Sequence, residues 1–104
     1  MDLALSDQEQ IIEICRKNDI SFCGLFGSYA RHEARETSDV DLLIRFSKPK
    51  SLLGHISISN QLQDALGKEI DLVTESELSP HIRENVLRDL KVIYGEPRKA
   101  IYRL

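Results

Sequence analysis

The chain has 104 residues, which suffices for one domain and leaves no room for a second, so residues 1–104 are treated as a single unit. Hydrophobic residues make up 41% and charged residues 30%, which are ordinary values for a folded protein and argue against a disordered chain. The net charge of −3 argues against nucleic acid as the main substrate, because backbone binding normally uses a basic surface.

Targeting signals and metal-binding cysteines are not evident in the sequence. Residues 1–7 lack the basic start and apolar core of a secretory signal, and no run approaches the ~20 apolar residues that cross a bilayer. Cys15 and Cys23 lie in apolar segments and lack the spacing of structural zinc ligands, so we expect buried thiols, with a disulfide as the weaker alternative. These features predict a cytoplasmic protein with no membrane partner.

The first part of the chain predicts a helix, a buried strand and a short helix. Ser6 and Glu9 fit a capping box, and apolar residues at helical spacing follow over about residues 7–17. Residues 20–26 are apolar, contain two phenylalanines and stop at a glycine, which indicates a buried strand. Residues 29–34 contain helix formers and predict a short helix.

The rest of the chain alternates strands and helices. Residues 40–46 form the clearest strand, and residues 52–66 predict a helix that Gly67 is placed to cap. The remaining predicted elements are a strand at residues 69–74, a helix at 80–89 with Ser79 as N-cap, a strand at 91–94 and a tail at 98–104. This order predicts an α/β or α+β domain, in which the helix at 52–66 is long enough to connect two parallel strands. The pattern leaves open how the first two strands are related.

Two carboxylates share one face of the strand at residues 40–46. Side chains alternate along a strand, so Asp39 and Asp41 point the same way, while Val40 and Leu42 face the core. Two such charges at ~4 Å repel by about 4 kcal/mol at an effective dielectric of ~20. Exposure, protonation or a bridging cation relieves this repulsion, and oxygen ligands of this kind suit Mg²⁺. Asp71 adds a third carboxylate if its strand lies alongside, although Asp-x-Asp by itself is also a common surface feature.

A glycine–serine turn precedes this acidic motif. Gly27 ends a strand and permits close approach of a ligand to the backbone, while Ser28 offers a hydroxyl and an amide at a helix start. Arg31 follows one helical turn later and could pair with the same phosphates. The turn therefore suits the phosphates of a nucleotide, although Gly-Ser by itself is also an ordinary connection.

Together these residues resemble a known family. Gly27-Ser28, ten intervening residues, Asp39-Val40-Asp41 and a later Asp71 resemble the nucleotidyltransferase superfamily typified by DNA polymerase beta. The Ala-Arg and Ser-Asp flanks of the two motifs resemble its minimal nucleotidyltransferase (MNT) branch. One departure is His32, where many relatives have glycine.

The resemblance implies a polymerase-beta-like fold, with a mixed central sheet and flanking helices on one side. It implies Mg²⁺ held by Asp39, Asp41 and Asp71, with nucleotide phosphates at Gly27-Ser28. The implied reaction transfers AMP from ATP and releases pyrophosphate, with Asp71 helping to activate the acceptor hydroxyl. Catalysis would consist of positioning and charge neutralisation.

The resemblance also implies a partner. Short proteins of the MNT branch resemble the antitoxins of HEPN–MNT toxin–antitoxin pairs, in which the MNT protein silences a HEPN ribonuclease by adding AMP to a tyrosine. Two alternatives stay open: a non-catalytic antitoxin that masks the toxin by binding, and an aminoglycoside-type small-molecule nucleotidyltransferase that acts as a homodimer. The base of the nucleotide, the number of metal ions and the oligomeric state are not determined by the sequence.

Overall fold

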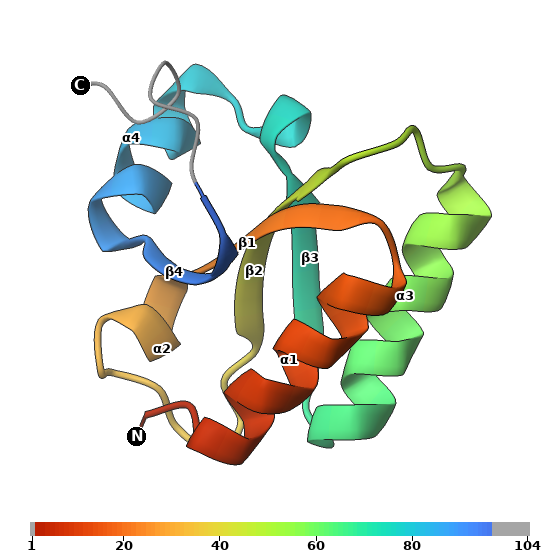
Figure 1. Ribbon diagram of the computed structural model, residues 1–104. Helices are drawn as coiled ribbons and strands as arrows, with labels where there is room; N and C mark the ends of the chain where they lie inside the picture. The colour runs from red at the N-terminus through yellow and green to blue at the C-terminus, as the bar shows by residue number, and fades with distance from the viewer. Residues whose placement is uncertain (1, 97–104) are drawn as a thin grey trace.

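The computed structural model describes residues 2–96, in which a four-stranded mixed sheet is covered by helices (Figure 1). The strands are β1 (Ile20–Phe26), β2 (Val40–Phe46), β3 (Ile70–Thr74) and β4 (Lys91–Gly95), in the order β3-β2-β1-β4. The helices are α1 (Leu5–Lys17), α2 (Gly27–Ala30), α3 (Leu52–Leu66) and α4 (Pro80–Asp89), with a 3-10 turn η1 (Glu75–Glu77). The predicted fold class is confirmed.

The strand directions bring three strand ends to one edge of the sheet. β1 is antiparallel to β2 and β4, and β2 is parallel to β3 across the connection made by α3. The crossover role predicted for residues 52–66 is therefore confirmed, and the first two strands prove to be antiparallel neighbours. Because of these directions, the end of β1 lies beside the starts of β2 and β3.

Both faces of the central strands are apolar. Leu42 and Cys23 contact the larger core cluster beneath α1 and α3, whereas their neighbours Leu43 and Phe22 belong to a smaller cluster with Val86 of α4. The expectation of helices on one side of the sheet is thus wrong. A strand such as Leu42-Leu43-Ile44, buried on both faces, needs cover on both, and α4 provides the second layer.

Helix boundaries differ from the sequence expectation at two sites. Leu3 is buried, and α1 begins at Leu5 after the N-cap Ala4 with no side-chain cap, so the capping box predicted at Ser6 and Glu9 does not form. The short helix predicted to reach residue 34 ends at Ala30.

His32 explains the early end of α2. Its φ of +62° lies in the left-handed region, which a right-handed helix cannot continue. Glycine adopts this conformation without a side-chain penalty, whereas His32 adopts it with a side chain. The histidine ring lies between two charged partners, with Nε2 2.8 Å from Lys91 Nζ and Nδ1 beside the Asp2 carboxylate.

Several other sequence predictions are confirmed. Gly67 caps α3 in the left-handed conformation, α4 begins at Pro80, and Cys15 and Cys23 are buried free thiols. No helix within residues 2–96 has the length and apolar character that a membrane span requires. The tail predicted at residues 98–104 lies outside the described residues.

Candidate functional site

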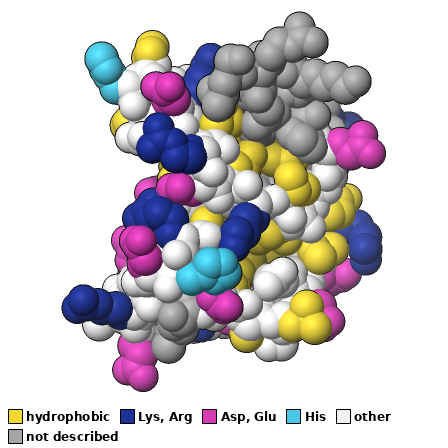
Figure 2. Space-filling view, turned by 90° about the vertical axis from the view of Figure 1, so that its left-hand side faces the viewer, with side chains coloured by type: hydrophobic (Ala, Val, Ile, Leu, Met, Phe, Trp, Pro, Cys, Tyr) yellow, Lys and Arg dark blue, Asp and Glu magenta, His cyan; other side chains and the backbone are white. Residues whose placement is uncertain are grey.

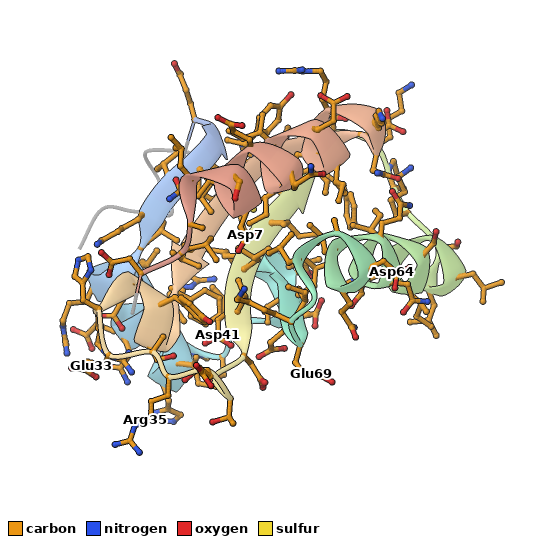
Figure 3. All side chains as sticks on the ribbon, turned by 90° about the horizontal axis from the view of Figure 1, so that it is seen from below. Asp7, Glu33, Arg35, Asp41, Asp64 and Glu69 are labelled. Carbon is orange, nitrogen blue, oxygen red and sulfur yellow. The ribbon has the colours of Figure 1, made fainter. Side chains whose placement is uncertain are left out.

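The predicted carboxylates lie where β1 ends and β2 and β3 begin. In the parallel register of β2 and β3, Asp41 is directly opposite Asp71, and in the antiparallel register Asp41 is opposite Phe26 of β1. Asp39 precedes β2 by one residue and is exposed, as is Asp71. Figure 3 looks onto this end of the molecule from below, with Asp41 between Glu33 on one side and Glu69 on the other. The predicted neighbourhood of Asp41 and Asp71 is therefore present.

We call the part of the sheet that carries Asp39, Asp41 and Asp71 the acidic corner. Its electrostatics are dominated by like charges around Asp41. Burial, followed by the negative charges of Asp71 and Asp39, raises the pKa of Asp41 to about 6. The positive charge of Arg31 acts in the opposite direction, and a hydrogen bond with Asp71 further raises the pKa. A half-buried carboxylate with two acidic neighbours is stabilised by a proton or by a cation.

Hard oxygen ligands of this kind fit a divalent cation, although three carboxylates do not yet converge. Among residues 2–96, no group of three His, Cys, Asp or Glu side chains is arranged to hold a metal ion. Asp41 and Asp71 are already paired across the strands. Asp39 is exposed, so its side chain can change rotamer at little cost. The donor set therefore fits Mg²⁺, with Asp41 and Asp71 as its preformed part.

Gly27 lies against the Asp41 carboxylate. Its φ is +75°, and a Cβ added to it would lie 2.0 Å from Asp41 Oδ2. Only glycine therefore fits this position without displacing the acid. The sequence predicted that a ligand approaches the backbone at Gly27, which stays a prediction; the structure shows that the Asp41 carboxylate also lies against this glycine.

Ser28 lies within α2 and Arg31 directly follows it, both next to this contact. Ser28 is half-buried in the first turn of α2, and Arg31 is the C-cap residue of the same helix. Arg31 donates from Nη1 to Asp89 Oδ2 over 2.7 Å and from Nε to Glu33 Oε2 over 3.2 Å. Asp89 was not among the predicted site residues, and no local signal could reveal it, because it lies 58 positions after Arg31 in the sequence.

Hollows in the surface lie on both ends of the sheet. One of about 530 Å³ lies at the far end, where β2 and β3 finish, and its lining contains none of the predicted site residues. Another of about 410 Å³ is lined in part by Ser38, Asp64 and Glu69; it too contains none of the predicted site residues, although Ser38 directly precedes Asp39 in the chain. We assign the site to the acidic corner, because its geometry brings together the groups with reactive chemistry, whereas volume alone specifies no chemistry.

Comparison with known proteins shows the family to which the sequence is similar. Residues 9–99 match the family described as "Polymerase beta, Nucleotidyltransferase". A relative from Thermococcus cleftensis named "Protein adenylyltransferase MntA" is 39% identical over 93 residues, which cover 85% of this chain and 94% of the relative.

Solved structures show the same fold. One, described as a toxin-antitoxin with AMP-PNP, superposes with a TM-score of 0.79 at 22% identity and covers 91% of this chain and 80% of its own. A second contains a tri-AMPylated Shewanella oneidensis HEPN toxin in complex with an MNT antitoxin, and superposes with a TM-score of 0.68 at 23% identity over 86% of this chain and 71% of its own. At these identities the two structures establish the fold.

Proposed function

Since the chain belongs to the polymerase beta nucleotidyltransferase family, we propose that it is a protein adenylyltransferase antitoxin that transfers AMP from ATP to a hydroxyl of a HEPN toxin. The observation that carries this proposal is the pairing of Asp41 with Asp71 across β2 and β3, beside Gly27. The similarity to the Thermococcus protein adenylyltransferase supports a protein as acceptor.

The proposed site divides the reaction among few residues. Asp39, Asp41 and Asp71 would hold Mg²⁺, which when bound supplies positive charge to the phosphates of ATP. Gly27 and Ser28 would offer backbone amides and a hydroxyl to the phosphates, and Arg31 would add its positive charge. The exposed Asp71 would accept the proton of the acceptor hydroxyl.

In the proposed transfer one bond forms and one bond breaks. The acceptor oxygen, which we infer to be a tyrosine hydroxyl, bonds to the α-phosphorus of ATP. The bond from that phosphorus to the bridging oxygen breaks, and pyrophosphate leaves. The site would contribute by holding the reacting groups close together in the orientation that the transfer requires.

The open position of the acidic corner suits a macromolecular acceptor. Asp39 and Asp71 are exposed at the edge of the sheet, so a tyrosine on the surface of a partner can reach them. The partner would therefore complete the acceptor site. A cytoplasmic location is part of the same proposal, because ATP and a ribonuclease toxin are both found there.

Transfer of label tests the proposal directly. The protein is incubated with α-labelled ATP, Mg²⁺ and a co-purified or genetically adjacent HEPN protein, whose ribonuclease activity is followed. We expect label on the HEPN protein and loss of its ribonuclease activity, and we expect Asp39→Asn to abolish both. Inhibition of the ribonuclease without label would contradict the proposal in favour of masking. Label on an added aminoglycoside, with none on protein, would favour the small-molecule alternative.

The pKa of Asp41 predicts how metal binding depends on pH. Because the pKa is raised to about 6, protons compete with the cation below that value and are largely absent above it. We expect the affinity for Mn²⁺, used as a probe for Mg²⁺, to be constant above about pH 7 and to fall by about tenfold from pH 7 to pH 5. Calorimetric titration over this range measures the effect. An affinity unchanged between pH 7 and pH 5 would exclude Asp41 as a ligand.

A further inference from the structure

Arg31 is fixed between two carboxylates of unequal burial. The Asp89 side chain is 16% exposed and accepts from Nη1 at 2.7 Å, whereas the Glu33 side chain is 66% exposed and accepts from Nε at 3.2 Å. A short contact to a mostly buried carboxylate restricts an arginine more than a longer contact to an exposed one. Asp89 is therefore the partner that determines where the guanidinium lies.

Asp89 occupies a position that its own helix disfavours. It is the last residue of α4, where the partial negative charge of the helix end repels a carboxylate. Arg88, the preceding residue, has the sign that this position favours. The acidic side chain at position 89 is therefore not explained by helix stability, and its contact with Arg31 gives it a different role.

The end of α4 is held in place by the sheet. Leu90, directly after Asp89, packs against the cluster that contains Phe22 and Leu43. A Cβ added to Gly24 of β1 would lie 2.5 Å from Leu90 Cδ1, so the missing side chain of Gly24 makes room for Leu90. The backbone of α4, which ends at Asp89, is thus packed against β1.

Arg31 in turn acts on the acidic corner. Its backbone N–H donates to the carbonyl of Gly27 over 3.1 Å, and Gly27 lies against the Asp41 carboxylate, so the arginine is attached one helical turn from that acid. Nε and Nη1 are occupied by the two carboxylates, and Nη2 donates no hydrogen bond to the described residues. One edge of the guanidinium is therefore available to a ligand.

We propose that Asp89 is a positioning residue that holds the Arg31 guanidinium at the acidic corner, so that Nη2 meets the phosphates of a bound nucleoside triphosphate. This inference rests on the proposed function and assigns a role to α4, which carries none of the predicted site residues. Figure 2 shows the molecule from the side on which α2 and α4 lie in Figure 1, with acidic and basic side chains alternating along the left of the view.

If Asp89 acts only through its negative charge, its removal should change nucleotide affinity in the opposite direction from its removal as a residue that positions Arg31. Deleting a negative charge near an anion site strengthens anion binding by electrostatics alone. Deleting the acceptor that orients Arg31 weakens binding, because the arginine must then be ordered by the nucleotide itself. The sign of the change therefore separates a positioning residue from a neighbouring charge.

The test measures binding of AMP-PNP with Mg²⁺ to the full chain by calorimetry, together with the melting temperature. We expect Asp89→Ala to weaken binding about fivefold and Asp89→Glu to restore it to within about twofold. Glu33→Ala is the matched control, since it removes the same charge from the same arginine at an exposed position, and we expect binding that is unchanged or slightly tighter. In an Arg31→Gln background, Asp89→Ala should no longer weaken binding and should leave it unchanged or slightly tighter.

Three results would overturn the inference. In the first, Asp89→Ala binds nucleotide as tightly as wild type or more tightly, while Arg31→Gln binds it more weakly. This result contradicts the positioning role of Asp89 and leaves the role of Arg31 standing. Binding that is lost in Asp41→Asn but unchanged in Arg31→Gln removes Arg31 from the site and leaves the proposed function standing. A wild-type protein that binds no nucleotide contradicts the proposed function as well. Lower stability of Asp89→Ala is separated from these results by measuring binding well below its melting temperature.

Discussion

Asp41→Asn should abolish AMP transfer and at the same time make the metal-free protein more stable. The substitution removes the most buried of the three proposed metal ligands, and we expect the transfer rate to fall by about a thousandfold or more. Asparagine preserves the size of the side chain and can still hydrogen-bond with Asp71, so the fold should be retained. Transfer of label from ATP to the HEPN protein measures the first effect.

The gain in stability follows from the raised pKa of Asp41. Because the folded protein binds the proton more tightly than the unfolded chain, Asp41 contributes a loss of stability as pH rises from about 4 to about 6, and the full penalty remains above pH 6. Asparagine has no such penalty. Urea denaturation in EDTA should therefore show a variant-minus-wild-type difference in free energy of unfolding that grows from pH 4.5 to pH 7. A difference that is flat with pH would mean that Asp41 is not perturbed as described.

Asp71→Asn is the matched control for this prediction. It removes the other member of the pair at an exposed position, and its effect on stability should be smaller because little burial is relieved. Its effect on transfer should remain large if Asp71 accepts the hydroxyl proton. Equal stabilisation by both variants would indicate that repulsion within the pair, and not burial, dominates.

Gly27→Ala should disable the site by displacing Asp41. The left-handed backbone alone costs an alanine about 1 kcal/mol, and a Cβ at 2.0 Å from Asp41 Oδ2 requires the carboxylate or α2 to move. We expect a total loss of stability of about 2–4 kcal/mol and transfer reduced below detection. Urea denaturation and the label assay measure the two effects.

Gly67→Ala separates conformational strain from contact. Gly67 has a similar φ of +65°, but a Cβ added there would have no atom within 4 Å. The Gly67→Ala variant should therefore lose only about 1 kcal/mol of stability, from backbone strain, and should still transfer AMP. If Gly27→Ala is no more destabilised than Gly67→Ala and still transfers AMP, the contact with Asp41 is not important for the site.

The sequence alone predicted several elements and the face on which two of the acids lie, because side chains alternate along a strand and turn residues mark the ends of helices. The strand at residues 40–46, the helix at 52–66 and the cap at Gly67 were predicted with the bounds that the structure has, because apolar periodicity and a left-handed glycine are local signals. The same parity placed Asp39 and Asp41 on one face. The capping box at Ser6 does not form, because α1 begins at Leu5 and Ser6 therefore lies inside the helix.

Tertiary structure decided the features that depend on distant residues. Pairing of Asp41 with Asp71 requires β2 and β3 to be parallel neighbours, which the sequence could state only as a condition. The carboxylate that fills the space beside Gly27, and the contact of Arg31 with Asp89 from α4, join segments that share no pattern. The sequence thus determined which chemical groups the protein carries and on which face of each strand they lie. The packing of the sheet and α4 decided which of these groups meet, because contact between distant segments depends on strand order and on burial of both sheet faces.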